Sequence, residues 1–306
     1  MKSYVLEQTI RTAQHIIHKI PLEEQRLGQT KLFSVRGIPK EIHCELVEDF
    51  EMHSEWVIPE KYDDEVIIFY THGGGYGMGD LISSRALIAP IAKHCGLKAF
   101  SFEYRLSPEY QFPAPLEDCA KAYEYILSKG YEPKNIVILG DSAGGGLLFS
   151  VLQYLKQRGY KLPHCGIAIS PWTDLTITAE SYETMDKADP ILSDEVLEKF
   201  AEAYIGEESP LNPLVSPVFG KYDESYPPIL IQVGNKEVLY DDSVRMKQVL
   251  EQSGVNVTME VYQNMFHIFH IWKIQEAEEA IENIHQFIKK QFYDRKCINE
   301  ANKKLV

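Results

Sequence analysis

Apolar and polar residues alternate in blocks along most of the chain. From Val66 onward, short apolar runs are separated by longer stretches in which apolar residues recur every three or four positions. The short runs are typical of buried strands and the longer stretches of helices. This alternation predicts a mostly parallel sheet covered by helices on both faces. The expected strands are 65–70, 97–104, 135–139, 165–169, 228–233 and 257–262, and the expected helices are 83–95, 116–128, 143–158, 242–253 and 274–292.

Two regions do not follow this alternation of strands and helices. The first stretch has helical spacing from Leu6 to Ile20 and is closed by Pro21, and segments 42–49 and 54–60 are expected to form an antiparallel pair. Residues 175–227 separate two strands and contain their own helical pattern at 193–205. A connection of this length is usually functional, for example as a lid.

We therefore expect an α/β core, built on a mostly parallel sheet flanked by helices, with a helical cap. The cap would consist of an N-terminal segment, 1–40, and an insertion, 175–215, while residues 41–174 and 216–292 form the core. The final residues, 293–306, are a polar tail that is expected to fray. The alternative is that the insertion is a surface excursion with no role in binding.

Composition and charge narrow the possible functions. The 306 residues carry 31 basic and 45 acidic side chains, a formal charge of −14, which disfavours nucleic acid and anionic lipid as partners. The five cysteines are scattered without a C-x-x-C pair, so zinc sites and disulfide frameworks are not expected. The N-terminus lacks the apolar run of a signal peptide, and no segment is long enough to span a bilayer. We expect a cytoplasmic protein without metal or organic cofactor, which could form a homodimer.

A serine lies within a glycine-rich turn between an expected strand and an expected helix. Residues 140–144 read G-D-S-A-G, with Ser142 at the centre. In a strand–turn–helix context this pattern is a nucleophile elbow, in which small neighbours let the serine hydroxyl project above the strand end. The alternatives are a tightly packed helix start and a phosphate-binding loop. The sequence contains neither of the usual phosphate-loop patterns, G-x-x-x-x-G-K-[ST] or G-x-G-x-x-G.

A second glycine-rich loop follows the strand at 65–70. Residues 72–75 read H-G-G-G, a loop that can offer backbone N–H groups to a developing oxyanion. We expect Gly73, Gly74 and Ala143 to supply these donors. His72 is expected to orient the loop rather than to act as the base.

The base and the acid should follow the last two strands, because the chain order in this architecture is Ser, acid, His. His267 lies in the expected loop after 257–262, and His270 is the alternative base. Glu237, Asp241 and Asp242 compete as the acid; Glu237 is nearest the strand end, whereas the two aspartates suit a helix start. The other histidines are expected at the surface: His15, His18, His43, His53, His94, His164 and His285.

Several ordered stretches together resemble one family. They are 70–80, 102–119, 140–146, 170–176, 212–220, 227–242 and 265–269. The chain resembles the hormone-sensitive-lipase-like, or bacterial family IV, carboxylesterases of the α/β-hydrolase fold. The resemblance implies Ser142 as nucleophile, His267 as base and Glu237 as acid, although many members have aspartate at the acid position. It also implies a cap that favours short acyl chains.

The resemblance and the motifs together predict a serine carboxylesterase. Tyr76 and Asp141, beside the two glycine motifs, are candidate substrate contacts, although core packing is an alternative for Tyr76. Arg105, Glu109 and Asp118 are expected to form an ion-paired structural corner. Amide or lactone hydrolysis would use the same machinery, and a non-catalytic small-molecule receptor on this scaffold is a further alternative. The receptors of this type lack the catalytic histidine, whereas His267 is present here.

Overall fold

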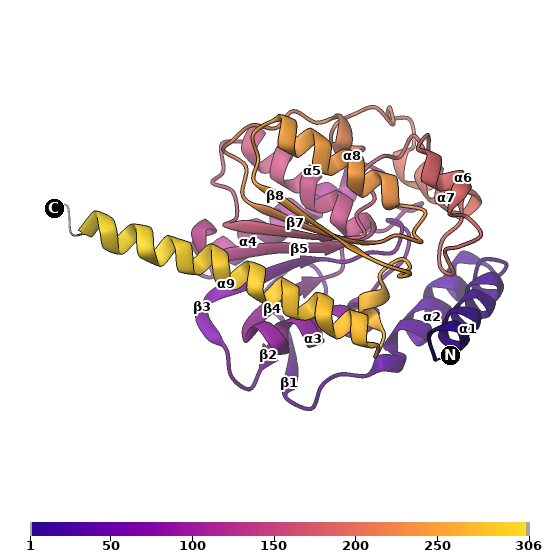
Figure 1. The fold of residues 1–306 in the computed structure, drawn as a ribbon, viewed down its shortest axis with the longest axis horizontal. Coiled ribbons are helices and arrows are strands. Elements are labelled where there is room, and N and C mark those ends of the chain that lie inside the picture. The colour runs from indigo at the N-terminus through magenta and orange to yellow at the C-terminus, as the bar shows by residue number, and fades with distance from the viewer. Residues whose placement is uncertain (1, 304–306) are drawn as a thin grey trace.

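The computed structural model describes residues 2–303, and the side chains of residues 5–292. Within these residues the chain forms an eight-stranded sheet in the order β1-β2-β4-β3-β5-β6-β7-β8 (Figure 1). The strands are β1 (Ile42–Leu46), β2 (Ser54–Pro59), β3 (Asp63–Thr71), β4 (Leu97–Phe102), β5 (Ile136–Asp141), β6 (Cys165–Ile169), β7 (Ile229–Gly234) and β8 (Val257–Tyr262). The β1–β2 and β2–β4 pairs are antiparallel, and every other pair is parallel.

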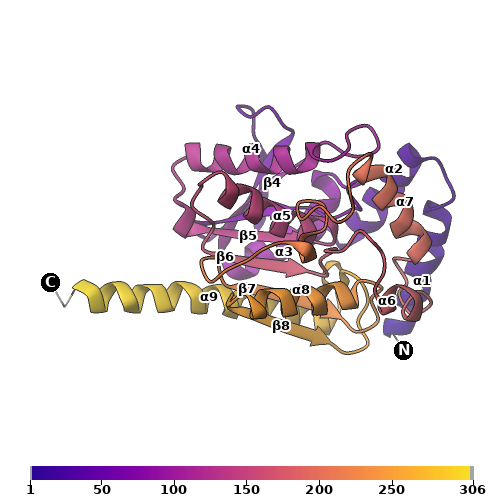
Figure 2. The same cartoon turned by 90° about the horizontal axis from the view of Figure 1, so that it is seen from above.

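Helices cover both faces of the sheet. The α-helices are α1 (Lys2–Ile17), α2 (Leu22–Phe33), α3 (Leu81–Cys95), α4 (Ala114–Ser128), α5 (Ala143–Gln157), α6 (Glu180–Thr184), α7 (Asp194–Ile205), α8 (Tyr240–Gln252) and α9 (Gln275–Lys303). Helices α3 and α9 contact each other on one face, and α4, α5 and α8 pack on the other (Figure 2). Successive β3 residues point to opposite faces, so Val66 and Ile68 join one core cluster while Ile67 and Phe69 join the other.

The predicted core elements are confirmed, including the antiparallel pair at the N-terminal edge. The N-terminal region was only partly predicted. Helix α1 ends before Pro21, as expected, but a second helix, α2, follows directly. Its sequence contains Gly28 and has little amphipathic periodicity, so the pattern did not reveal it. Gly28 lies against Ile17, and the small residue lets α1 and α2 pack closely.

The N-terminal helices and the insertion lie at the same end of the molecule, beyond the sheet (Figure 2). The guanidinium of Arg11 on α1 donates to the backbone carbonyls of Lys187 (2.9 Å) and Ala188 (3.2 Å) in the connection between α6 and α7. These two hydrogen bonds therefore join the N-terminal helix α1 to the insertion, although the two segments are far apart in sequence.

The ion-paired corner and the C-terminal segment each differ in part from the prediction. Arg105 pairs with Asp118 as predicted, but Glu109 does not join this corner, because it pairs with Arg26 on α2 instead. At the C-terminus, α9 continues through Lys303, so residues 293–303 of the expected polar tail are helical, and residues 304–306 lie outside the described residues.

Candidate active site

The predicted site residues gather where parallel strands end. Ser142 directly follows β5, Glu237 follows β7 and His267 follows β8, while the glycine-rich loop follows β3. The carboxyl ends of parallel strands meet at one edge of a sheet, and loops leaving that edge can converge. The sheet order places β3 and β5 side by side and β7 beside β8, which brings these loops together.

Three side chains form a continuous hydrogen-bonded chain. The Ser142 hydroxyl oxygen lies 2.9 Å from Nε2 of His267, and Nδ1 of His267 lies 3.1 Å from Oε2 of Glu237. All three residues are buried, and Glu237 is fully so. A serine, a histidine and a carboxylate in this order form the arrangement in which the imidazole can take the serine proton while the carboxylate orients the ring.

The second oxygen of the acid is also held. Oε1 of Glu237 accepts hydrogen bonds from the Ser170 hydroxyl (2.8 Å) and from the Gly234 backbone N–H (2.5 Å). The Ser170 hydroxyl accepts from the Ile268 N–H at 3.3 Å, so it connects the acid to the loop that carries the base. Sequence reasoning missed Ser170, although its position at the end of β6, beside β7, was a usable signal.

The competing acids have other partners. Asp241 accepts from the Ser181 N–H at 2.9 Å, and Asp242 accepts from the Thr173 N–H at 2.7 Å. Both contacts tie α8 to the segment that follows β6. Of the three competing carboxylates, the structure brings Glu237 to the imidazole.

A further carboxylate, missed by sequence reasoning, lies close to this chain. Asp189, in the connection between α6 and α7, is buried and accepts from the N–H of Val238, the residue after Glu237, at 3.2 Å. Burial raises the pKa of Asp189 to about 6. Burial lowers the pKa of His267, but the hydrogen bond and charge of Glu237, with the charges of Asp189 and Asp141, outweigh it and raise the pKa of the imidazole above its usual value.

The turn around Ser142 explains its small neighbours. Ser142 has φ 54°, in the left-handed region that side chains rarely adopt. A Cβ at Gly140 would overlap the Gly144 carbonyl, and one at Gly144 would overlap the Thr71 carbonyl. The Ser142 carbonyl accepts from Gly146 and from Trp172, which fixes the turn. The glycines thus allow a strained nucleophile position at the start of α5.

The loop after β3 runs against the nucleophile. A Cβ at Gly73 would meet the Asp141 carboxylate and the Ser142 side chain, and Gly74 has φ 117°. His72 holds this loop: Nδ1 lies 2.8 Å from the Gly73 carbonyl oxygen, and the ring stacks on Tyr104 with centroids 4.1 Å apart. Tyr104 in turn donates from its hydroxyl to the His72 carbonyl. His72 is thus positioned to orient the loop.

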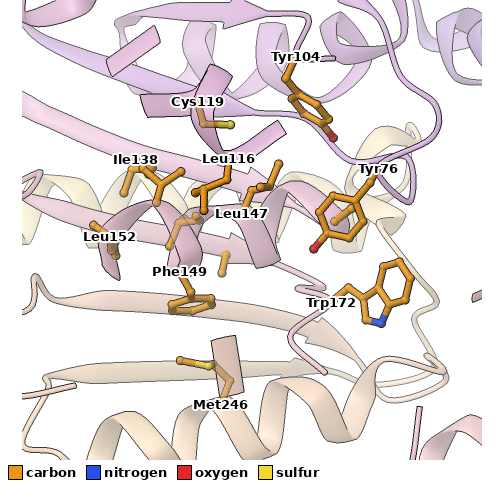
Figure 3. Close-up of a cluster of buried hydrophobic side chains, with 14 of the residues drawn as sticks. Tyr76, Tyr104, Leu116, Cys119, Ile138, Leu147, Phe149, Leu152, Trp172 and Met246 are labelled. Carbon is orange, nitrogen blue, oxygen red and sulfur yellow. The ribbon is translucent and has the colours of Figure 1, made fainter. Parts of the chain in front are cut away.

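The two candidate substrate contacts have different surroundings. Asp141 lines the cavity beside Ser142, but its Oδ1 accepts from the Tyr70 hydroxyl (2.6 Å) and the Gly73 N–H (3.1 Å). Burial raises its pKa to about 6. Tyr76 lies in the hydrophobic core, stacked on Tyr204 and close to Trp172, and is not among the cavity-lining residues (Figure 3). Its position favours packing, so substrate contact by Tyr76 stays a prediction.

His270 is unsuited to act as the base. Its ring is buried, and Nε2 bonds the side-chain oxygen of Gln232 at 3.0 Å rather than the serine. Burial lowers its pKa to about 3, so it is neutral at ordinary pH. His18 was expected at the surface, which is wrong: it is half-buried and lines the cavity that contains Ser142.

A small cavity adjoins the reactive groups. It has a volume of about 50 Å³, and Ser142, His267 and the glycine loop form its floor. Its walls come from α1, α2, α3 and α7, together with the loop before α7, and the apolar wall residues include Phe33, Leu87, Ile191, Leu197 and Phe200. Such a space holds only a few water-sized groups, at about 10–15 Å³ for each.

Metal-binding clusters and membrane-spanning helices are both absent from the described residues. No group of three or more histidine, cysteine, aspartate or glutamate side chains there could hold a metal ion. No helix in that part of the chain combines the length and apolarity needed to cross a membrane.

Comparison with known proteins decides the family. A family model described as the alpha/beta hydrolase fold matches residues 68–271, which include all three members of the hydrogen-bonded chain. The chain belongs to the alpha/beta hydrolase fold family. The eight-stranded order of this alpha/beta hydrolase, with its antiparallel β2 and otherwise parallel neighbours, agrees with that family.

Relatives of this alpha/beta hydrolase include an acetyl-hydrolase and an esterase. It is 38% identical over 215 residues to an acetyl-hydrolase of Streptomyces hygroscopicus, covering 70% of this chain and 71% of the relative. It is 37% identical over 202 residues to an esterase of Acinetobacter venetianus, covering 66% of each chain. These relatives support an ester hydrolase activity.

Solved structures agree over nearly the whole chain. An esterase/lipase from an uncultured bacterium superposes with a TM-score of 0.86 and 33% identity, covering 93% of this chain and 98% of the other. An esterase from the bacterial hormone-sensitive lipase family superposes with a TM-score of 0.88 and 32% identity, covering 93% and 97%. The resemblance to this esterase family is therefore confirmed.

Proposed function

We propose that the protein is a serine carboxylesterase that hydrolyses short-chain acyl esters through an acyl-enzyme. The observation that carries the proposal is the 2.9 Å contact between the Ser142 hydroxyl and Nε2 of His267. In the first step His267 takes the serine proton as Ser142 attacks the ester carbonyl. Glu237 holds the imidazole and stabilises its protonated form. His267 then gives its proton to the leaving alcohol, and water hydrolyses the acyl-enzyme by the same roles.

The oxyanion would be held by backbone N–H groups of Gly73, Gly74 and Ala143. Ala143 is the first residue of α5, and an N–H at this position has no acceptor within its own helix. The Gly73 N–H already donates to Asp141, so we assign Gly74 and Ala143 as the main donors and Gly73 as a shared one. The adjacent start of α5 favours negative charge through the helix dipole.

The short-chain preference follows from the cavity. Residues 1–40 and 175–215 would act as a cap whose side chains limit the space above Ser142. A volume of about 50 Å³ beside Ser142 matches a small acyl group. Amide or lactone hydrolysis stays an alternative on the same three residues. A cytoplasmic location and a homodimer also stay predictions.

Loss of the nucleophile tests the proposal directly. Ser142→Ala should abolish turnover of p-nitrophenyl acetate while the far-UV circular dichroism spectrum stays unchanged. Removal of the serine of such a triad can lower kcat by about 10⁶-fold. Ser128→Ala, at an exposed position near the end of α4, is the matched control and should keep full activity. Substantial turnover by a folded Ser142→Ala variant would refute the assignment.

A further inference from the structure

Two buried amides from the N-terminal helices face the cavity without a partner. Gln14 on α1 is 6% exposed and Gln29 on α2 is 7% exposed, and both line the cavity that contains Ser142. Among the described residues, neither side chain makes a hydrogen bond or ion pair. A buried polar group without a partner is destabilising, so such groups in native proteins usually serve a ligand or an ordered water.

A third polar group lies beside them. His18 lines the same cavity, and its Nε2 is buried with no hydrogen-bond partner among the described residues. Burial lowers the pKa of His18, and a backbone hydrogen bond with Ile191 only partly offsets this, so the ring is neutral at pH 7. A neutral ring that uses its other nitrogen toward Ile191 leaves Nε2 as an acceptor for a hydroxyl or N–H group.

Gln14 and His18 lie where the small cavity meets a larger cleft. The cavity shares five lining residues with a larger cleft of about 540 Å³, namely Gln14, His18, Ile191, Leu192 and Phe200. The cleft lies between α1, α2 and residues 186–203. The small inner cavity can hold the reacting ester, and the remainder of a larger substrate would lie past Gln14 and His18 in the cleft.

We propose that the natural substrate is a short-acyl ester whose non-reacting part carries hydroxyl or amide groups, and that Gln14, His18 and Gln29 bind those groups. The amides can each donate and accept, and His18 accepts, so the three together match a hydroxyl-bearing ester better than a plain alkyl ester. This inference rests on the proposed esterase function and specifies its substrate class.

Matched ester pairs test the inference in the wild-type protein. Each pair exchanges a hydroxyl for a methyl group: 2-hydroxyethyl against propyl acetate, 3-hydroxypropyl against butyl acetate, and methyl 3-hydroxybutanoate against methyl 3-methylbutanoate. Acid release at constant pH gives kcat/KM. We expect the hydroxylated ester to be favoured by about tenfold or more in at least one pair, since sites built to bind a hydroxyl reject analogues that lack it. Equal or lower values in all three pairs would overturn the inference.

Substitution of Gln14 tests whether this side chain causes the preference for hydroxylated esters. Gln14→Met keeps the side-chain length and removes the amide, and the favoured pair should then approach a ratio of one, chiefly through a higher KM for the hydroxylated ester. Gln8→Met makes the same change at an exposed position of α1 and should leave both kcat/KM values unchanged. A Gln14→Met ratio equal to that of the wild type would overturn the assignment. Hydrolysis of p-nitrophenyl acetate by the wild type separates failure of this inference from failure of the esterase function.

Discussion

At the scale of single residues, the site depends on how each carboxylate is held. Glu237 uses one oxygen for His267 and the other for Ser170 and Gly234, so its orientation is fixed from both sides. The order of strand ends, the G-D-S-A-G motif and the family resemblance together favoured Ser142, His267 and Glu237, with Asp241, Asp242 and His270 as alternatives. It could not reveal Asp189, because that residue comes from the insertion and reaches the site only through tertiary packing.

Asp189 provides a pH-dependent prediction. Its negative charge stabilises protonated His267, so Asp189→Asn should lower the pKa of His267. Glu237 and Asp141 are the other carboxylates that raise this pKa, and both remain in the variant. Catalysis needs neutral His267, so activity rises with pH through its pKa. The acid limb of the kcat/KM profile should therefore move to lower pH.

The control for this experiment lies in the same connection. Asp186→Asn removes a half-buried carboxylate that accepts from the Asp194 N–H, and it should leave the acid limb in place. An unchanged limb in Asp189→Asn, or a movement to higher pH, would show that Asp189 does not act on His267.

At the scale of elements, α2 is the part of the structure that the sequence did not reveal. Most of its residues are good helix formers, but its apolar residues show little amphipathic periodicity, and its position is set by tertiary contacts. Arg26 on α2 donates to the carbonyl oxygens of Gly77 (2.8 Å) and Ser107 (2.9 Å), and it also pairs with Glu109. The Gly77 contact lies close to the glycine-rich loop, so the same side chain links the expected cap to the site.

Loss of this anchor should affect both stability and binding. Arg26→Met leaves two carbonyls without their charged donor, and we expect the free energy of unfolding to fall by about 2 kcal/mol. The KM for p-nitrophenyl esters should rise, because α2 forms part of the cavity wall. Denaturant unfolding and steady-state kinetics measure the two effects.

Glu109→Gln is the comparison, because it removes only the surface ion pair. A loss of about 0–1 kcal/mol is expected for that change. If Arg26→Met were no more destabilising than Glu109→Gln, the carbonyl contacts would not anchor α2.

At the scale of the whole molecule, the parallel sheet accounts for most of what could be predicted. Its buried strands read as continuous apolar runs, and the parallel order sends their loops to one edge, so residues 142, 237 and 267 could be grouped before any geometry was known. Sheet topology does not fix the positions of the regions outside the sheet. The contacts of α1 and α2 with residues 186–203 depend on shape and on single polar side chains, so the sequence pattern did not place Gln14, His18 and Gln29 at the cavity.

Covalent labelling tests the central claim most directly. Phenylmethylsulfonyl fluoride reacts with a serine that a neighbouring base activates, and peptide mapping by mass spectrometry locates the sulfonyl group. We expect one group per chain, on the peptide containing Ser142, with esterase activity lost in proportion to labelling, and no labelling of a His267→Ala variant. Inactivation with the label on another residue, or full labelling of Ser142 with undiminished activity, would contradict the account.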